Sequence, residues 1–229
     1  MKRNNLFLLL FVLILFVPFF ISDDIYNLYE TLNKNHGFIL SFIKFSILAT
    51  LGEVIGLRIK TGHYNASGFG IIPRAIVWGF LGITIKLAFI VFTSGTLDFL
   101  TYMGMENPAS VYKADFTMQK LFIAFCISFL MNSIFAPVMM TIHKVTDTHI
   151  LNTGGTIIGF FKPIKVSHIL TNLNWDVQWN FVFKKTIPFF WYPAHTITFL
   201  LPAEFQILFA ALLGIALGLI LAISSLKGR

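Results

Sequence analysis

The chain has 229 residues, of which 56% are hydrophobic and only 12% are charged. Soluble domains carry a charge on about a quarter of their residues, so this composition excludes an ordinary soluble domain. The net charge of +7 would suggest nucleic-acid binding in a soluble protein, but here the cations gather in particular loops. We therefore expect a membrane and not a nucleic acid as partner. The single cysteine, Cys126, excludes an internal disulfide framework and a cysteine-based metal cluster.

Long apolar segments recur along the whole chain. A helix that crosses a bilayer needs about 20 mostly apolar residues, and the segments that come near this length are 5–22, 37–57, 71–95, 120–143, 181–201 and 203–226. Lipid offers no partners to backbone N–H and C=O groups, which favours helices over open strands. The sequence predicts an all-α polytopic bundle of about six spans, forming a single integral membrane domain over residues 1–229.

The first of these segments has two interpretations. Met1, Lys2 and Arg3 precede its leucine-rich core, as in a signal peptide, but its end lacks the small-residue cleavage pattern. An uncleaved membrane anchor is the favoured reading.

The charges of the loops predict an orientation. Both termini and the loops after the second and fourth segments are basic, whereas the loops after the first and third segments are mainly acidic. Cytoplasmic loops carry the excess of lysine and arginine. We therefore expect both termini in the cytoplasm, with a bacterial inner (cell) membrane as the location. The bilayer is the expected partner, together with further copies of the chain if it forms a homo-oligomer.

The fourth loop is more than a linker. After Pro163, apolar residues recur at helical spacing among polar ones, and Trp175 and Trp179 follow. Tryptophan favours the membrane–water boundary. This pattern predicts an amphipathic helix near 163–178 that lies in the interface. A loop helix packed on the end of the bundle is nearly as favoured.

Two charged residues are expected to pair near the cytoplasmic side. At 1.5 Å per residue, Glu53 lies about 8 Å and Arg74 about 5 Å from the inner ends of their segments. Lys86 lies about 22 Å in, too deep to reach Glu53. We therefore predict a Glu53–Arg74 ion pair, whose favoured role is to orient two helices.

Lys86 is costly in hydrocarbon, by roughly 3 kcal/mol or more, and so calls for a partner, a water path or a function. Ala75, Gly79 and Gly82 form a stripe of small residues that continues to Lys86, which predicts that this lysine faces another helix. Its depth matches those of Asn132 and His195.

Two prolines fall near these polar residues. Pro137 and Pro193 are expected to break their helices, because proline lacks the backbone N–H. A wet cavity lined by Lys86, Asn132 and His195 is one hypothesis for this region. A polar knot that only fixes the helix register is equally favoured.

Other chemistry is not indicated. The histidines do not show the spacing of metal ligands with acids or cysteine, and we assign no metal. Phosphate-binding glycine loops, nucleophile elbows and HExxH motifs do not occur in the sequence, so we expect neither a cofactor nor enzymatic activity.

The C-terminal half contains a family-like motif. The run from Trp175 through Gln178 and Asn180 to Phe181, followed by Pro188, resembles the signature of the small peroxisomal and mitochondrial inner-membrane Mpv-type proteins. Pro73-Arg74, before a glycine-rich helix, is similar to an earlier Pro-x-x-Arg…Gly region of that family. The resemblance implies a divergent, bacterial member, with channel-like behaviour and poorly defined substrates. The family typically has about four spans.

Three functions remain open at this point. The first is a small channel or facilitator for anions or small polar metabolites, because a lysine in the vestibule favours anions. The second is a structural or interaction protein whose buried polar residues only hold helices together. An intramembrane enzyme is third: Glu53, His143 and His195 are possible acid–base groups, but they lie at different depths and no nucleophile pairs with them.

Overall fold

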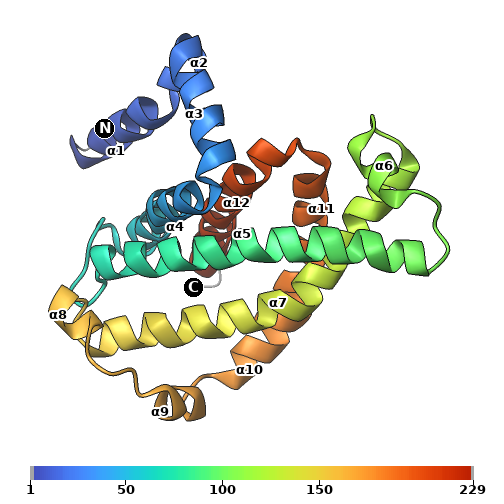
Figure 1. Ribbon diagram of the computed structural model, residues 1–229. Coiled ribbons are helices and arrows are strands. Elements are labelled where there is room, and N and C mark those ends of the chain that lie inside the picture. The colour runs from blue at the N-terminus through green and yellow to red at the C-terminus, as the bar shows by residue number, and fades with distance from the viewer. Residues whose placement is uncertain (1–2, 228–229) are drawn as a thin grey trace. The chain divides into compact units, whose positions relative to one another are not determined.

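Figure 1 shows the computed structural model of the chain, which describes residues 3–227 as helices and connecting loops, without a strand among them. The all-α class is therefore confirmed. The chain separates into two compact units, Met1–Leu40 and Ser41–Arg229, which are described individually.

The described part of the first unit consists of α1 (Arg3–Phe16), α2 (Pro18–Ile21), α3 (Asp23–Asn35) and the start of α4 at Gly37. The expected continuous helix over 5–22 is not observed. It is interrupted at Val17, because Pro18 cannot donate the backbone hydrogen bond that would extend α1. A helix of 14 residues is about 21 Å long, which is less than the roughly 30 Å of a hydrocarbon core. Ser22 then caps α3 by accepting a hydrogen bond from the backbone N–H of Ile25.

Among the described residues, four helices are long and apolar enough to cross a membrane. They are α4 (Gly37–Thr61), α5 (Ile71–Tyr102), α7 (Met118–Asn152) and α12 (Ala203–Lys227), the last judged over Ala203–Ile220. These helices confirm the helical segments predicted at 37–57, 71–95, 120–143 and 203–226. The α5 and α7 helices extend beyond the predicted ends, because polar residues such as Lys144 and Asp147 continue the helix after its apolar part.

The predicted fifth segment, 181–201, lies in a longer helical run that is largely a π-helix. It begins with α10 (Trp175–Val177), continues as the π-helix η1 (Gln178–Trp191) and ends with α11 (Tyr192–Leu200). π-helices are rare and often occur at functional sites. The first backbone N–H of α11, that of Tyr192, still bonds five residues back, to the carbonyl of Ile187.

The loop between α7 and η1 contains short helices instead of one amphipathic helix. These are α8 (Ile157–Phe160), α9 (Val166–Thr171) and α10. Residues 172–174 are not helical, so the predicted continuous helix over 163–178 is not observed. Val166, Trp175 and Trp179 are nevertheless exposed. A further short helix, α6 (Pro108–Lys113), lies between α5 and α7.

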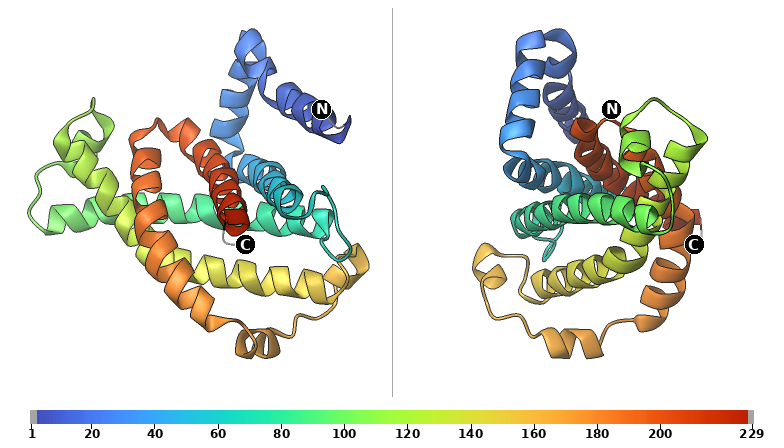
Figure 2. Two further views of the ribbon diagram at one scale, coloured as in Figure 1. Left: turned by 180° about the vertical axis from the view of Figure 1, so that it is seen from behind. Right: turned by 45° about the vertical axis from the view of Figure 1, so that its right-hand side comes forward.

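Within the second unit, α7 packs against both α5 and α11, and α12 packs against α11 (Figure 2). The buried side of α7 includes Ile123, Ala124 and Ile127, which are fully buried. These contacts make α7 the central helix of the unit.

The α4 and α5 helices approach closely at the predicted stripe of small residues. A Cβ atom added at Gly82 would lie 2.6 Å from the Ser41 carbonyl oxygen, and one at Gly79 would lie 2.5 Å from the Phe42 ring. Only glycine allows this approach. Ser46 Oγ adds a hydrogen bond of 2.7 Å across the same interface, to the Ala75 carbonyl.

Neither of the two predicted helix-breaking prolines ends a helix. Pro137 lies inside α7, which continues to Asn152 but changes direction along its length (Figure 1). An internal proline bends a helix by removing one hydrogen bond and by ring contact with the preceding turn. Pro193 is the second residue of α11, where its missing N–H is tolerated and where the π-helix passes into an α-helix.

Candidate functional site

Two groups of polar side chains lie among the helices of the second unit. The first, which we call the Arg74 cluster, joins α4, α5 and α7 and consists of Glu53, Arg74, Trp78, His143 and Asp147. The second consists of Asn132, Trp191 and His195. These residues line a cavity between α4, α5, α7, η1, α11 and α12, and we call this cavity the His195 cavity.

Arg74 is the centre of its cluster. Its Nη1 donates to Glu53 Oε2 at 2.6 Å, its Nη2 contacts the carboxylate of Asp147, and its Nε donates to the Phe69 carbonyl at 2.6 Å. The guanidinium also lies 4.4 Å from the centroid of the Phe69 ring. Arginine suits this position because its planar donors can serve several acceptors at once. The Glu53–Arg74 contact is the one expected from the depths of the two residues.

Glu53 is held by donors from two further side chains. Its Oε1 accepts a hydrogen bond of 2.9 Å from Trp78 Nε1 and lies 3.2 Å from His143 Nε2. The rings of Trp78 and His143 are also in contact, with centroids 4.4 Å apart. The carboxylate of Glu53 therefore links α4 to α5 through Arg74 and Trp78, and to α7 through His143.

The two carboxylates of the cluster outnumber its one arginine, and an exposed lysine next to the cluster adds a second cation. Glu53 and Asp147 contribute two negative charges, and Arg74 contributes one positive charge. Lys144 supplies a second positive charge 3.7 Å from Asp147.

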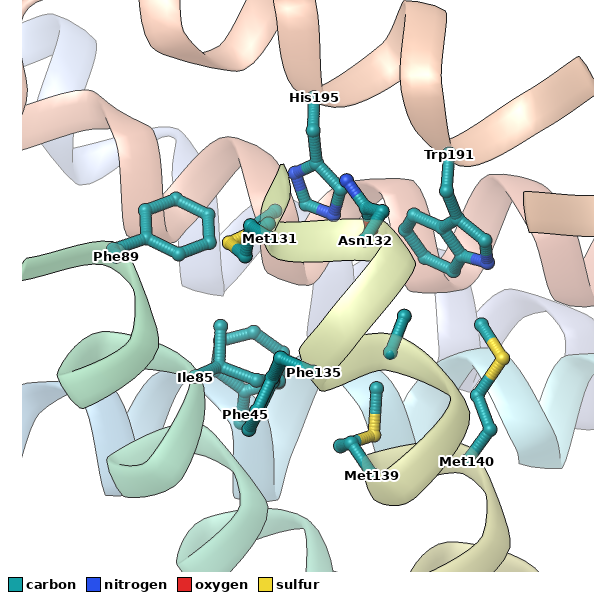
Figure 3. Close-up of a pocket in the computed structure, with 12 residues that line it drawn as sticks. Phe45, Ile85, Phe89, Met131, Asn132, Phe135, Met139, Met140, Trp191 and His195 are labelled. Carbon is teal, nitrogen blue, oxygen red and sulfur yellow. The ribbon is translucent and has the colours of Figure 1, made fainter. Parts of the chain in front are cut away.

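The His195 cavity has a volume of about 40 Å³ and is mostly apolar (Figure 3). Its lining comes from five helices and η1: Phe45, Ile85, Phe89, Met131, Asn132, Phe135, Ala136, Met139, Met140, Trp191, His195 and Ala210. A site of this size has room for about three water molecules.

His195 is buried in the wall of this cavity, with 6% of its surface exposed. Its ring stacks on the Trp191 ring at 5.1 Å and meets Phe89 edge-on at 5.6 Å. Two buried nitrogens, His195 Nδ1 and Trp191 Nε1, have no hydrogen-bond partner among the described residues. Because buried polar atoms are nearly always hydrogen-bonded, such atoms beside a cavity indicate a capacity to bind a polar ligand or water.

Asn132 reaches the same cavity from α7, and its side chain is anchored. Its Nδ2 donates to the Ser128 carbonyl at 2.8 Å and lies 3.3 Å from Ser128 Oγ, which itself donates to the Tyr192 carbonyl at 2.8 Å. These bonds connect α7 to the first residue of α11. The structure thus brings Asn132 and His195 to one cavity.

Lys86 is not among the residues that line the cavity, contrary to the prediction. Its neighbour Ile85 lines the cavity instead, and Lys86 is half-buried on another face of α5. Lys44 holds the equivalent place on α4, next to the lining residue Phe45. Consecutive residues of a helix differ by 1.5 Å along its axis, so both lysines stand at the level of the cavity.

Trp78, Asp147 and Trp191 were not predicted from the sequence, and His143 was considered only as a possible acid–base group of an enzyme. His143 and Asp147 are four apart and therefore share a face of α7, a signal that pointed to a shared partner. Trp78 likewise follows Arg74 by four residues. Trp191, in the π-helix, gave no comparable signal.

Comparisons of the chain with protein-family models, with characterised proteins and with solved structures gave no match. Among the described residues, no three histidine, cysteine, aspartate or glutamate side chains gather as a metal ion would require.

Proposed function

We propose that the chain is a multi-pass membrane protein that acts as a small channel-like or facilitator protein for anions or small polar solutes. The observation that carries the proposal is the His195 cavity. It lies where the helices of the second unit meet, and two unpartnered buried nitrogens, on His195 and Trp191, border it. Ligand sites commonly combine an apolar lining with a few polar groups that fix the ligand.

The lysines favour an anion as the solute. Lys44 and Lys86 are the chain neighbours of the lining residues Phe45 and Ile85, and no described carboxylate forms an ion pair with Lys86. Charged residues at membrane depth commonly mark ion and substrate pathways. Positive side chains near a pore favour anions.

The size of the cavity limits the solute. About 40 Å³ accommodates water or a small monovalent ion. A larger metabolite would need the helices around the cavity to move apart. Such a movement would break the fewest α-helical hydrogen bonds at the bend of α7 and in η1. Pro137 already lacks one of these bonds, and η1 has the π-helical pattern instead.

The proposal includes a topology. Six crossings require that α1 and α2 form one span and that η1 and α11 form another. The second of these is a helical run of 23 residues, 14 in η1 and 9 in α11. The loop charges support cytoplasmic termini in a bacterial inner membrane. The exposed Trp175 and Trp179 support an interfacial position for the α8–α10 region. We also propose that the chain is a divergent member of the Mpv-type family, on the basis of the motif from Trp175 to Phe181.

A structural or interaction role is the alternative, and the Arg74 cluster favours it. Its ion pairs join three helices, and such a network can serve only to fix their packing. In that case the polar groups of the cavity would hold the helix register and nothing would pass.

Flux in proteoliposomes distinguishes the two functions. Wild-type protein and Lys86→Leu would be compared for uptake of chloride, nitrate and small neutral metabolites. Lys113→Leu, which changes an exposed lysine of α6, is the matched control. The proposal expects wild-type anion uptake that Lys86→Leu reduces, with unchanged unfolding of the detergent-solubilised protein. A folded wild type that passes none of these solutes would favour the structural role.

A further inference from the structure

The α3 helix has an apolar side and a polar side. Ile25, Leu28 and Leu32 follow one another at intervals of three and four residues, so they share one side of the helix, which we call the α3 apolar face. The remaining sides carry polar and charged residues: Asp23, Asp24, Asn27, Glu30, Thr31, Asn33, Lys34 and Asn35. This pattern is typical of a helix at a boundary between water and an apolar phase.

The α3 apolar face is open. Ile25, Leu28 and Leu32 keep 40%, 58% and 37% of their surfaces exposed, and none of the residues of α3 is buried. Tyr29 contacts the Phe19 ring of α2 edge-on, with centroids 5.4 Å apart, which joins the two helices without covering the three aliphatic side chains. Exposing such side chains to water is unfavourable, so the face calls for an apolar partner.

The neighbours of α3 along the chain indicate what this partner is. Only Ser22 separates α3 from α2, and only His36 separates it from α4. The α4 helix is long and apolar enough to cross a membrane, and Phe20 and Ile21 at the end of α2 are exposed apolar residues. A linker of one residue spans at most about 3.6 Å. Both ends of α3 therefore stay at the level where these apolar helices meet the surface of the bilayer.

The α3 helix itself is not suited to cross the bilayer. Its 13 residues are about 20 Å long, less than the roughly 30 Å of a hydrocarbon core, and four of them are charged. Local features favour the helix where it lies. Ser22 caps its start, Asp23 and Asp24 occupy its first turn, and Lys34 occupies its last turn, as the helix dipole prefers.

We propose that α3 lies flat in the membrane–water interface, with the α3 apolar face inserted among the lipid acyl chains and its charged side in water. Because α3 carries three acidic residues and one lysine, the lipid is recognised by its apolar chains and not by a negative headgroup. The inference goes beyond the proposed function, since it requires α4 to enter a membrane but does not require a solute to pass the His195 cavity.

The experiment measures the surroundings of single spin labels on full-length protein in phosphatidylcholine liposomes. Cys126→Ser removes the native thiol, and Leu28→Cys or its neighbour Asn27→Cys, the matched control, then carries a nitroxide. Collisions with oxygen report lipid, and collisions with a water-soluble nickel complex report water. We expect the ratio of oxygen to nickel collisions to be several-fold higher at Leu28 than at Asn27. The same difference should separate Leu32 from Lys34.

Three outcomes of this measurement decide the proposal. A several-fold difference that is unchanged when half of the lipid is replaced by anionic phosphatidylglycerol would support insertion by apolar contact. Equal, high nickel collisions at all four positions would place α3 in water and overturn the proposal. Low collisions with both reagents at Leu28 and Leu32 would also overturn it, because another part of the protein or a second copy would then cover the face.

A second measurement needs only the wild type and therefore does not depend on the folding of a variant. The protein is reconstituted with a lipid that carries a photoactivated diazirine on its acyl chain, and the labelled peptides are identified by mass spectrometry. Ile25, Leu28 and Leu32 should be labelled, whereas the polar loop residues 62–68 should not. Label on α4 without label on α3 would overturn the proposal and leave a membrane protein intact. Label on neither would contradict the membrane location as well.

Discussion

The Arg74 cluster and the His195 cavity are two polar regions built on the same helices, yet they treat their polar groups differently. In the Arg74 cluster, opposite charges from α4, α5 and α7 meet each other directly. In the His195 cavity, buried nitrogens of His195 and Trp191 find no partner among the described residues. Polar groups that are paired within the chain contribute to its packing, whereas unpaired ones retain the capacity to bind something else.

The difference predicts opposite consequences of mutation. Removing one member of a buried ion pair leaves the other charge uncompensated, and this costs stability. Replacing an unpartnered polar group by an apolar one of similar shape removes a desolvation penalty and costs little or none. Stability and transport should therefore separate between the two regions.

The largest effect is expected for Arg74→Met. This change leaves the carboxylates of Glu53 and Asp147 without their shared cation. We expect the free energy of unfolding to fall by about 3–5 kcal/mol. Denaturant unfolding in detergent micelles measures it. Arg58→Met, which removes an arginine that lies over the Tyr64 ring, should cost about 1 kcal/mol or less. Equal losses for the two variants would mean that the cluster is no stronger than a surface contact.

Gly82→Ala tests the helix contact on which both regions depend. The added Cβ would meet the Ser41 carbonyl at 2.6 Å and Phe45, a lining residue of the cavity, at 2.7 Å. Overpacking of this kind costs about 1–3 kcal/mol. Gly95→Ala on the same helix is the control, because an added Cβ there meets nothing within 4 Å. If both variants unfold alike, the close approach of α4 and α5 does not limit stability.

The smallest effect on stability is expected for His195→Phe. The ring stacking on Trp191 can be kept, while the unpartnered Nδ1 is removed. We expect the free energy of unfolding to stay the same or to rise by about 1 kcal/mol, as measured by the same denaturant titration. A loss comparable to that of Arg74→Met would show that His195 is paired in the protein and would remove the contrast between the regions.

The sequence was sufficient for the long apolar helices but not for their ends. Hydropathy locates α4, α5, α7 and α12. The apolar segment predicted for α7 ends at residue 143, whereas the helix continues to Asn152 through polar residues such as Asp147 of the Arg74 cluster. Pro18 marks the break of the first segment at Val17, although hydropathy alone does not show it. The π-helical hydrogen bonding of η1 has no periodic signal that distinguishes it from a continuous α-helix.

The site was predictable where one-dimensional depth was enough. Depth along the helices matched Glu53 with Arg74, and Asn132 with His195. It failed for Lys86, because residues at one level can still point to different faces of a helix, and Ile85 rather than Lys86 faces the cavity. The third helix of the Arg74 cluster, which brings His143 and Asp147, depends on tertiary packing that a single sequence does not display.

Anion uptake by His195→Phe tests the central claim most directly, namely that the cavity is the place through which solute passes. Nitrate and chloride uptake into proteoliposomes would be compared for this variant and the wild type, at equal amounts of folded protein. We predict that the variant folds as well as the wild type and loses most of its uptake, because the imidazole nitrogens no longer face the solute. Uptake equal to that of the wild type would contradict the claim and leave the cavity as a feature of packing.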